Sequence, residues 1–266
     1  MYLSIRQKAK IMDVNRSTVY YEAKPLKSIT IEIMDKILEL YMKYPFMGYR
    51  RIREMLKRLG YIINKKRVYR LMSELKLKAI YPKLNLSKKS SKELKADCLL
   101  KKETIKEVND AWLVDITYIK LSQGYVYLTG FIDAVSRKIM GWKLSPYLEA
   151  RESVESLKDA IKEIKPKLVN TDQGSQFTSK EWKKTVKENG IKVSIDEKPS
   201  DNILIERFWR TLKYEDVYLK SYDSVEEARK EIGKYISFYN YIRPHQSLKY
   251  KTPEECYKEN MESKNV

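Results

Sequence analysis

The sequence has few cysteines, a single histidine and no long apolar segment. Its two cysteines, Cys98 and Cys256, lie far apart and belong to no Cys/His cluster, so neither a zinc site nor a disulfide framework is predicted. No apolar run approaches the roughly 18 residues that a bilayer-spanning helix needs, and no signal-peptide pattern opens the chain. A heptad repeat is missing too, so no coiled coil is predicted. We expect free thiols, a cytoplasmic location and no membrane partner.

Positive charge is concentrated in the first part of the chain. The formal net charge is +18 over 266 residues. Residues 1–109 contain 27 Lys and Arg against 11 Asp and Glu, whereas residues 110–266 contain 27 against 25. A basic region of this kind attracts polyanions, so we expect the first part of the chain to bind nucleic acid.

The first 80 residues have the periodicity of helices. Residues 4–21 break into two short helices around Asp13, and a helix over residues 29–43 should stop at Tyr44, because Pro45 disfavours helix in the preceding residue. Two amphipathic helices separated by Gly60 then form a second helix-turn-helix candidate. Their apolar residues recur at i, i+3, i+4 and i+7: Ile52, Met55, Leu56 and Leu59, then Val68, Leu71, Met72 and Leu75.

Basic side chains gather on this second candidate motif. A recognition helix that begins near Asn64 would bring its N-terminal end to the DNA groove or the phosphates. The alternative is that these side chains form the solvated face of a helical bundle. The residues expected to contact DNA here are Arg50, Arg51, Lys65, Lys66, Arg67 and Arg70.

The second half of the chain alternates strand and helix patterns. Strands are predicted at residues 111–121, 124–133, 138–145, 167–171 and 191–195, and helices at 149–164, at 179–189 and from Asn202 onward. This order predicts an α/β core with a mixed sheet flanked by helices, preceded by an all-α helix-turn-helix region. The expected divisions are 1–81 for DNA binding, 82–109 as a basic linker, 110–240 as the core and 241–266 as a C-terminal tail.

Three acidic residues stand where the local pattern gives little reason for a carboxylate. Asp115 interrupts an apolar strand, Asp172 ends another, and Glu206 lies in a helical stretch. A buried carboxylate costs several kcal/mol unless a partner or a cation compensates its charge. Carboxylate oxygens are the ligands that Mg²⁺ prefers, and two such ions can clamp a phosphodiester during in-line displacement. The three residues therefore predict a metal-dependent DNA-cutting site.

Six segments, in order along the chain, carry a resemblance to a known family. The sequence resembles the DDE transposases of bacterial insertion sequences, specifically the second-frame (OrfB-type) product of the IS-three family, whose core resembles retroviral integrase. The matching segments are WLVDITY at 112–118, DAVSR at 133–137 followed by Gly141 and Trp142, NTDQGSQFTS at 170–179, DNILIERFWRTLK at 201–213, Tyr239 and Asn240, and RPHQSL at 243–248.

The resemblance implies a fold, an activity and partners. It implies a ribonuclease-H-like core in which Asp115, Asp172 and Glu206 are catalytic and bind two Mg²⁺ ions, with Mn²⁺ able to substitute. The implied reaction is cleavage and transfer of DNA strands between the insertion-sequence ends and target DNA during transposition. It further implies an upstream-frame partner or fusion, a homo-oligomer on DNA, and association with the bacterial nucleoid when bound.

Roles are also expected for residues other than the three carboxylates. Asn202, Glu206 and Lys213 are spaced to project from one helix face, and Asn202 and Lys213 are expected to contact DNA, Lys213 because it matches a family lysine. Trp209 on that helix is expected in the core. Asp133 is expected to hold the turn through Ser136 or Arg137, and His245 to have a structural or DNA-contact role.

The sequence departs from the family pattern in one loop. Between Asp172 and Glu206 lie 33 residues, about two fewer than the pattern, and residues 194–202 contain Pro199 but no glycine. Val114 also replaces a small polar residue before the first aspartate. A shorter, stiffer loop favours the rival hypothesis of a catalytically impaired DNA-binding remnant or regulator of transposition. A ribonuclease-H-type nuclease without strand transfer is the third alternative.

Overall fold

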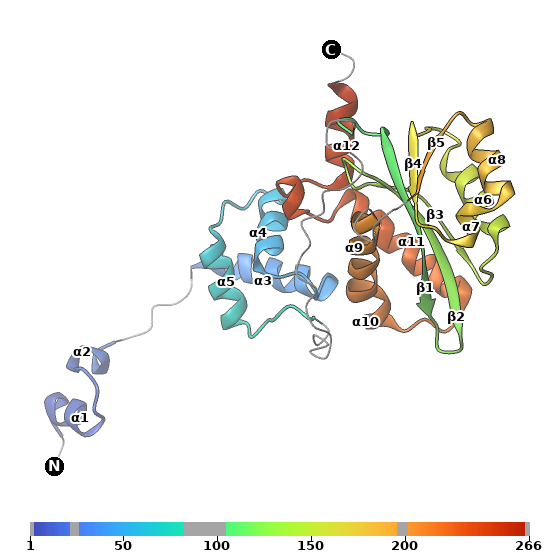
Figure 1. Ribbon diagram of the computed structural model, residues 1–266. Helices are drawn as coiled ribbons and strands as arrows, with labels where there is room; N and C mark the ends of the chain where they lie inside the picture. Colours follow the sequence, from blue (N-terminus) through green and yellow to red (C-terminus); the bar gives the residue numbers. More distant parts are fainter. Residues whose placement is uncertain (1–2, 22–26, 82–104, 196–201, 264–266) are drawn as a thin grey trace. The chain divides into compact units, whose positions relative to one another are not determined.

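Figure 1 shows the computed structural model, which describes residues 3–21, 27–81, 105–195 and 202–263. The chain divides into two compact units, Met1–Lys78 and Ala79–Val266. Cys98, most of the expected linker and most of the shortened loop lie outside the described residues. Cys256 is a free thiol, as predicted.

The first unit is entirely helical where it is described. Asn15 begins α2 by accepting a hydrogen bond from the Ser17 backbone N–H at 3.1 Å, after the chain turns at Asp13 with φ of 49°. This confirms the two short helices expected before residue 21. The helices are α1 (Ile5–Ile11), α2 (Arg16–Val19), α3 (Ser28–Lys43), α4 (Tyr49–Arg58) and α5 (Lys65–Glu74).

A small apolar core joins α3, α4 and α5. Its fully buried side chains include Ile37 of α3, Ile52 and Leu56 of α4 and Leu71 of α5, as the helical spacing predicts. The pattern is wrong at Leu59, which is 55% exposed, because α4 ends at Arg58 and the chain turns. The prediction that α3 stops at Tyr44 is confirmed.

A mixed five-stranded sheet forms the centre of the second unit. Its strand order is β3-β2-β1-β4-β5, with β1, β2 and β3 antiparallel and β4 and β5 parallel to β1. The five predicted strands are thereby confirmed, together with the turn at Gly124, whose φ is +86°. The strands are β1 (Ala111–Lys120), β2 (Tyr125–Asp133), β3 (Ile139–Ser145), β4 (Leu168–Thr171) and β5 (Lys192–Ile195).

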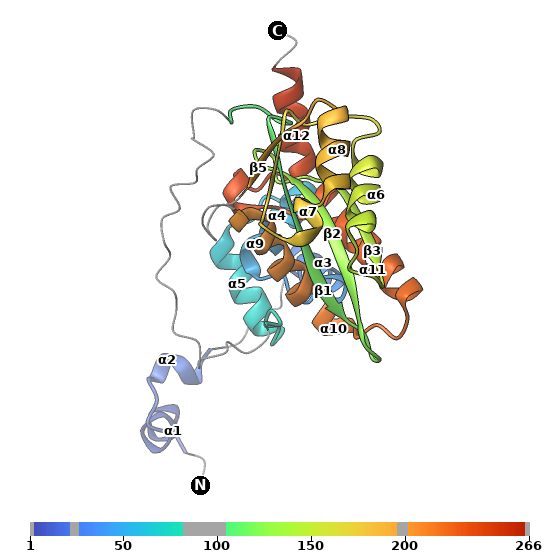
Figure 2. The same ribbon diagram turned by 45° about the vertical axis from the view of Figure 1, so that its right-hand side comes forward.

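Helices cover both faces of the sheet (Figures 1 and 2). On one face α6 (Ala150–Ala160), α7 (Ser175–Thr178) and α8 (Lys180–Glu188) enclose a core that includes Trp112, Phe131 and Trp182. The helices of the other face are α9 (Ile203–Leu212), the π-helix η2 (Lys213–Val217), α10 (Tyr218–Lys220) and α11 (Val225–Tyr241). The architecture confirms the predicted ribonuclease-H-like core.

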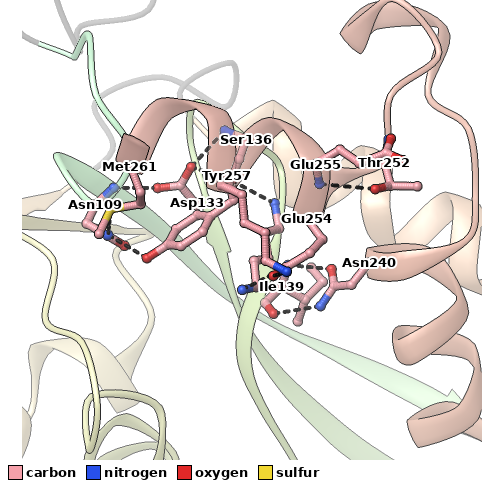
Figure 3. Close-up of polar contacts among 12 residues, drawn as sticks. Asn109, Asp133, Ser136, Ile139, Asn240, Thr252, Glu254, Glu255, Tyr257 and Met261 are labelled. Atoms are coloured by element: carbon pink, nitrogen blue, oxygen red, sulfur yellow. Dashed lines mark hydrogen bonds and ion pairs between the residues drawn. The ribbon is translucent and has the colours of Figure 1, made fainter. Parts of the chain in front are cut away.

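The C-terminal segment contains the 3₁₀ helix η3 (Gln246–Leu248) and α12 (Pro253–Glu262), and Figure 3 shows the polar contacts around it. The Tyr257 hydroxyl accepts a hydrogen bond from Asn109 Nδ2 at 2.7 Å. Asn240 at the end of α11 pairs with the backbone N–H and C=O of Ile139, at 2.9 and 3.0 Å. The first contact holds α12 against the segment just before β1. The second holds the end of α11 against the beginning of β3.

Asp133 organises the turn between β2 and β3. Its Oδ1 accepts hydrogen bonds from the Ser136 backbone N–H at 2.7 Å and hydroxyl at 2.6 Å, and its Oδ2 accepts one from the Asn109 N–H at 2.8 Å (Figure 3). The side chain is fully buried, and burial raises the pKa of this carboxyl although the hydrogen bonds oppose the rise. The predicted structural role through Ser136 is confirmed.

Candidate active site

Asp115 lies in the middle of the central strand β1, on the face covered by α9. Its Oδ1 accepts a hydrogen bond from the Ile116 N–H at 2.8 Å, and its Oδ2 accepts one from the Trp209 indole N–H at 3.0 Å. Burial raises the pKa of Asp115 to about 6, and the negative charges of Asp172 and Glu206 add to the rise. The three predicted carboxylates therefore share one electrostatic environment.

Strand register brings Asp172 to the level of Asp115. Strand β4 runs parallel to β1, and Leu113 pairs with Asn170. Asp115 and Asp172 each lie two residues beyond this pair, so they stand at the same level of neighbouring strands, Asp115 within β1 and Asp172 just after the end of β4. The Asp172 side chain is exposed, and its Oδ1 accepts a hydrogen bond from the Gly174 N–H at 2.9 Å.

Glu206 stands in the first turn of α9, where its side chain is exposed. Partial burial raises its pKa. Asn202, at the start of this helix, is 4% exposed and donates a hydrogen bond from Nδ2 to the Val114 carbonyl at 3.0 Å. Asn202 therefore attaches α9 to β1 beside Asp115, and its buried position does not support the DNA contact expected of it.

Trp209 fixes both the position of α9 and the orientation of Asp115. The side chain is 5% exposed, which confirms the expected core placement. A Cβ atom at Gly130 would lie 2.5 Å from Trp209 Cη2, so the glycine is what lets the indole approach β2. Gly130 is also the residue of β2 that pairs with Asp115. The hydrogen bond to Asp115 has no signal in the sequence, because the two residues lie 94 positions apart.

Lys213 brings positive charge to the edge of the carboxylate site. It begins η2, and its Nζ lies 4.6 Å from the centre of the Tyr118 ring. Partial burial lowers the pKa of Lys213, while the charge of Asp115 opposes that effect. Lys213 is thus close enough to the site for its charge and that of Asp115 to interact.

The carboxylates fit a divalent cation by their chemistry, although they are not gathered around one point. Among the described residues, no three Asp, Glu, His or Cys side chains are spaced to hold one ion. Asp115 is held by two hydrogen bonds, whereas Asp172 and Glu206 are exposed and can change rotamer at low cost. Because the charges of Asp172 and Glu206 add to the effect of burial in raising the pKa of Asp115, a bound cation would relieve a repulsion that is already present.

Buried polar groups form hydrogen bonds with Glu215, the third residue of η2. Arg243 donates two hydrogen bonds to Glu215, from Nη2 at 2.6 Å and Nε at 2.8 Å, and the Tyr235 hydroxyl donates a third at 2.9 Å. His245 is 6% exposed, and its ring packs edge-on against Tyr239 at 4.6 Å. This placement favours the structural alternative for the single histidine. The sequence analysis missed this network, which involves no local periodicity.

In the first unit, the expected DNA-contacting residues have different environments. Lys65 and Lys66 are exposed at the N-terminal end of α5, which has no acidic residue in its first turn. Positive charge is unfavourable at that end of a helix, so a folding role does not explain this lysine pair. Arg67 is half-buried and donates from Nη2 to Thr30 Oγ1 at 2.9 Å, which gives it a structural contact to α3. Arg70 forms an ion pair with Glu74 at 3.4 Å.

The two remaining arginines lie on α4. Arg50 is exposed at its first turn, next to the ring of Tyr49 at 5.7 Å, and Arg51 is half-buried. The structure therefore presents Lys65, Lys66 and Arg50 most openly.

Family models match two parts of the chain, the helical region and the α/β core. A family model described as an integrase core domain matches residues 106–200, and a second of the same description matches residues 189–253. A model described as an HTH-like domain matches residues 30–83. The fold and the sequence together define an integrase-type core that follows a helix-turn-helix-like region.

Curated relatives identify the family. The chain is 32% identical over 255 residues to the putative transposase InsK for insertion sequence element IS150 of Escherichia coli (strain K12), covering 91% of this chain and 89% of the relative. It is 35% identical over 222 residues to the transposase for insertion sequence element IS904 of Lactococcus lactis subsp. lactis (strain IL1403), covering 79% and 87%. The chain belongs to the IS-three family of insertion-sequence transposases.

One solved structure shows the same core fold. A chain of the simian T-cell lymphotropic virus intasome in complex with the PP2A regulatory subunit B56 gamma matches with a TM-score of 0.50 and 21% identity, over 56% of this chain and 54% of that chain. The HTLV-2 integrase catalytic core, solved in complex with magnesium, matches 56% of this chain and 96% of that core with a TM-score of 0.47.

No helix of the described residues has the length and apolar character to cross a membrane.

Proposed function

We propose that this transposase cleaves and transfers DNA strands at Asp115, Asp172 and Glu206, the DDE residues of its integrase core. The observation that carries the proposal is geometric: the β1–β4 register brings Asp172 level with Asp115, and α9, which carries Glu206 in its first turn, is hydrogen-bonded to Asp115 through Trp209. Burial, with a smaller contribution from the two acidic neighbours, raises the pKa of Asp115. A buried acid with two acidic neighbours at the ends of adjacent elements is a costly arrangement, and it is expected where a site binds cations.

Each residue has a distinct part in the proposed mechanism. Mg²⁺, for which Mn²⁺ can substitute, would activate the attacking hydroxyl and stabilise the departing 3′ oxygen when bound. Asp115 provides the fixed carboxylate, since β1, Trp209 and the Ile116 N–H hold it in place. Asp172 and Glu206 provide the adjustable carboxylates, and Lys213 places positive charge where a DNA phosphate can approach.

The test is a cleavage and joining assay on labelled duplexes that carry the ends of the element encoding the chain. The wild-type chain should nick the ends in Mg²⁺ or Mn²⁺ and join the freed 3′ ends to a second duplex. Asp172→Ala should abolish both reactions and keep the folded circular dichroism spectrum, because Asp172 is exposed. Asp159→Ala is the matched control, an exposed aspartate of α6 in an i,i+3 ion pair with Lys162.

A wild-type chain that binds these ends but never cleaves them would contradict the proposal. That result would support the alternative of a DNA-binding remnant or regulator, in which the shortened loop has impaired catalysis. Cleavage without joining would instead support a nuclease without strand transfer.

The proposed partners follow from the two units. The basic helical unit would bind the insertion-sequence ends, with the exposed Lys65 and Lys66 among the cations that contact DNA. Strand transfer needs two DNA ends and a target, so the active form would be a homo-oligomer on DNA, supplied with end recognition by an upstream-frame partner or fusion. Such a complex would act at the bacterial nucleoid.

A further inference from the structure

Four tyrosines form an aromatic surface beside the carboxylate site. We name this the tyrosine surface, and it consists of Tyr118 of β1, Tyr125 of β2, Tyr214 of η2 and Tyr218 of α10. Tyr118 is 61% exposed, Tyr125 is 55% exposed and Tyr218 is 57% exposed. These are large exposed fractions for side chains that bury 150–250 Å² when they pack, so the fold leaves much aromatic area open to solvent.

The rings are arranged as two neighbouring pairs. The ring centres of Tyr118 and Tyr125 lie 5.8 Å apart, and those of Tyr214 and Tyr218 lie 5.6 Å apart, both with edge-on geometry. Lys213 Nζ lies over the Tyr118 ring and Lys213 directly precedes Tyr214 in η2, so the two pairs belong to one patch. The patch combines the open edge of the β1–β2 hairpin with the segment that follows α9.

Two cations are built into the tyrosine surface. Lys213 Nζ lies 4.6 Å from the centre of the Tyr118 ring, and the Arg210 guanidinium carbon lies 5.5 Å from the centre of the Tyr214 ring. Lys213 follows Trp209, the hydrogen-bond partner of Asp115, by about one helical turn, and its charge interacts with that of Asp115. The surface is therefore aromatic, positively charged and continuous with the carboxylate site.

Aromatic faces next to cations are suited to single-stranded nucleic acid. Each base has a π-face that can stack on a ring, and lysine or arginine can neutralise the adjacent phosphate. In a closed duplex the base faces are covered by their neighbours, so only unpaired bases can use such a surface. A protein partner would also cover aromatic rings, but the two cations and the adjoining carboxylate site favour DNA.

We propose that the tyrosine surface stacks unpaired bases of the DNA end whose phosphodiester lies at the carboxylate site. The location of the DNA rests on the proposed function, whereas the stacking itself rests on the four rings and two cations. A frayed end held in this way would keep its terminal bases apart while the neighbouring phosphodiester reacts.

Binding measurements in metal-free buffer test the proposal without cleavage. The probes are two duplexes of equal length, one with a flush end and one whose end carries three unpaired nucleotides with 2-aminopurine in place of one base. The ratio of their dissociation constants cancels contacts that the basic helical unit makes to duplex phosphates. For the wild-type chain we expect tighter binding of the frayed end and quenching of 2-aminopurine fluorescence.

Matched variants separate stacking from other contacts. Tyr118→Ala and Tyr218→Ala should each weaken frayed-end binding by about 5- to 100-fold, the loss typical of one base–aromatic stack, with flush-end binding unchanged. Tyr118→Phe and Tyr218→Phe should bind like the wild type, because they keep the ring. Tyr241→Ala is the control, since Tyr241 is 56% exposed on α11 and outside the tyrosine surface.

Three results would overturn the proposal: an unchanged ratio in the Ala variants, an equal loss for flush and frayed ends, or a loss in the Phe variants as large as in the Ala variants. The Asp172→Ala comparison keeps this test separate from that of the proposed function. A chain that cleaves DNA but shows no frayed-end preference retains its proposed activity and has no stacking surface. A chain that prefers frayed ends but never cleaves DNA has the stacking surface and lacks the proposed activity.

Discussion

The indole nitrogen of Trp209 lies 3.0 Å from Oδ2 of Asp115, and this hydrogen bond joins α9 directly to the central strand. The same indole lies against Gly130, the β2 residue that pairs with Asp115. One side chain thus sets both the distance between helix and sheet and the direction of the carboxylate. The relationship explains how an aspartate in a largely buried strand keeps a defined orientation.

Trp209→Phe should lower the cleavage rate by about 10- to 100-fold, because a hydrogen bond to a charged group contributes roughly 1.5–3 kcal/mol. The aromatic ring is kept, so the chain should remain folded. Cleavage at saturating DNA over a range of Mg²⁺ concentrations measures the effect, which should include a higher Mg²⁺ requirement.

Gly130→Ala is the companion change, because the added Cβ would meet the indole at 2.5 Å. Gly130→Ala should lower the cleavage rate more in the wild-type background than in the Trp209→Phe background, since phenylalanine lacks the atoms that would clash. Equal effects in both backgrounds would show that the two residues act independently.

The pH dependence of stability should reveal Asp115. Its pKa is about 6 in the folded chain, against about 3.9 for an unperturbed aspartate. A raised folded-state pKa gives stability that is fully present below the unfolded value and is lost as pH rises through 6. In metal-free buffer, the free energy of unfolding should therefore lose on the order of 3 kcal/mol from this group between about pH 4 and pH 6.

Urea unfolding at a series of pH values measures this loss, and Asp115→Asn provides the comparison. The variant should show a shallower decline over the same pH range, because its side chain does not titrate. At pH 7, added Mg²⁺ should raise the melting temperature of the wild type and leave that of Asp115→Asn nearly unchanged. Identical pH profiles would show that Asp115 titrates normally.

The exposed lysine pair on α5 should contribute to DNA binding through phosphates. Replacing Lys65 and Lys66 with alanine should weaken binding to all duplex sequences alike and reduce the slope of log K against log salt by about 2. Stability should stay the same or increase slightly, because two unfavourable charges leave the N-terminal end of a helix. Lys76→Ala is a suitable control, being an exposed lysine just after α5. An unchanged salt slope would remove Lys65 and Lys66 from the DNA interface.

The buried pair of Arg243 and Glu215 should be important for stability. Arg243 is 5% exposed and makes two hydrogen bonds to Glu215, so Arg243→Ala removes the positive charge that neutralises this largely buried carboxylate and leaves it the hydrogen bond from the Tyr235 hydroxyl. We expect a loss of about 3 to 5 kcal/mol in the free energy of unfolding. Urea unfolding measures it, and Lys251→Ala, which removes an exposed ion pair with Glu259, should cost less than about 1 kcal/mol. A similarly small loss in Arg243→Ala would show that water or rearranged side chains replace the hydrogen bonds of Arg243.

Local chemistry in the sequence was sufficient for most elements. Alternating and β-branched runs predicted the five strands, and helical spacing predicted α4 and α5 with their buried residues. The capping box of Thr252 and Glu255, with Pro253 between them, is a local signal of the same kind for α12 that was not used. The π-helix η2 carries no comparable signal, because the groups that hydrogen-bond its Glu215 belong to Tyr235 and Arg243, 20 and 28 residues further along the chain.

The sequence by itself was sufficient to predict the class of protein, with its basic helical region and its α/β core, and to propose the three carboxylates in their order along the chain. The tertiary structure decided which groups surround them. It placed Asn202 against the Val114 carbonyl, Trp209 on Asp115, and Lys213 and Arg210 over the rings of Tyr118 and Tyr214. Periodicity reports which face of an element is apolar, whereas the partner of a polar side chain on a distant element depends on strand register and helix packing.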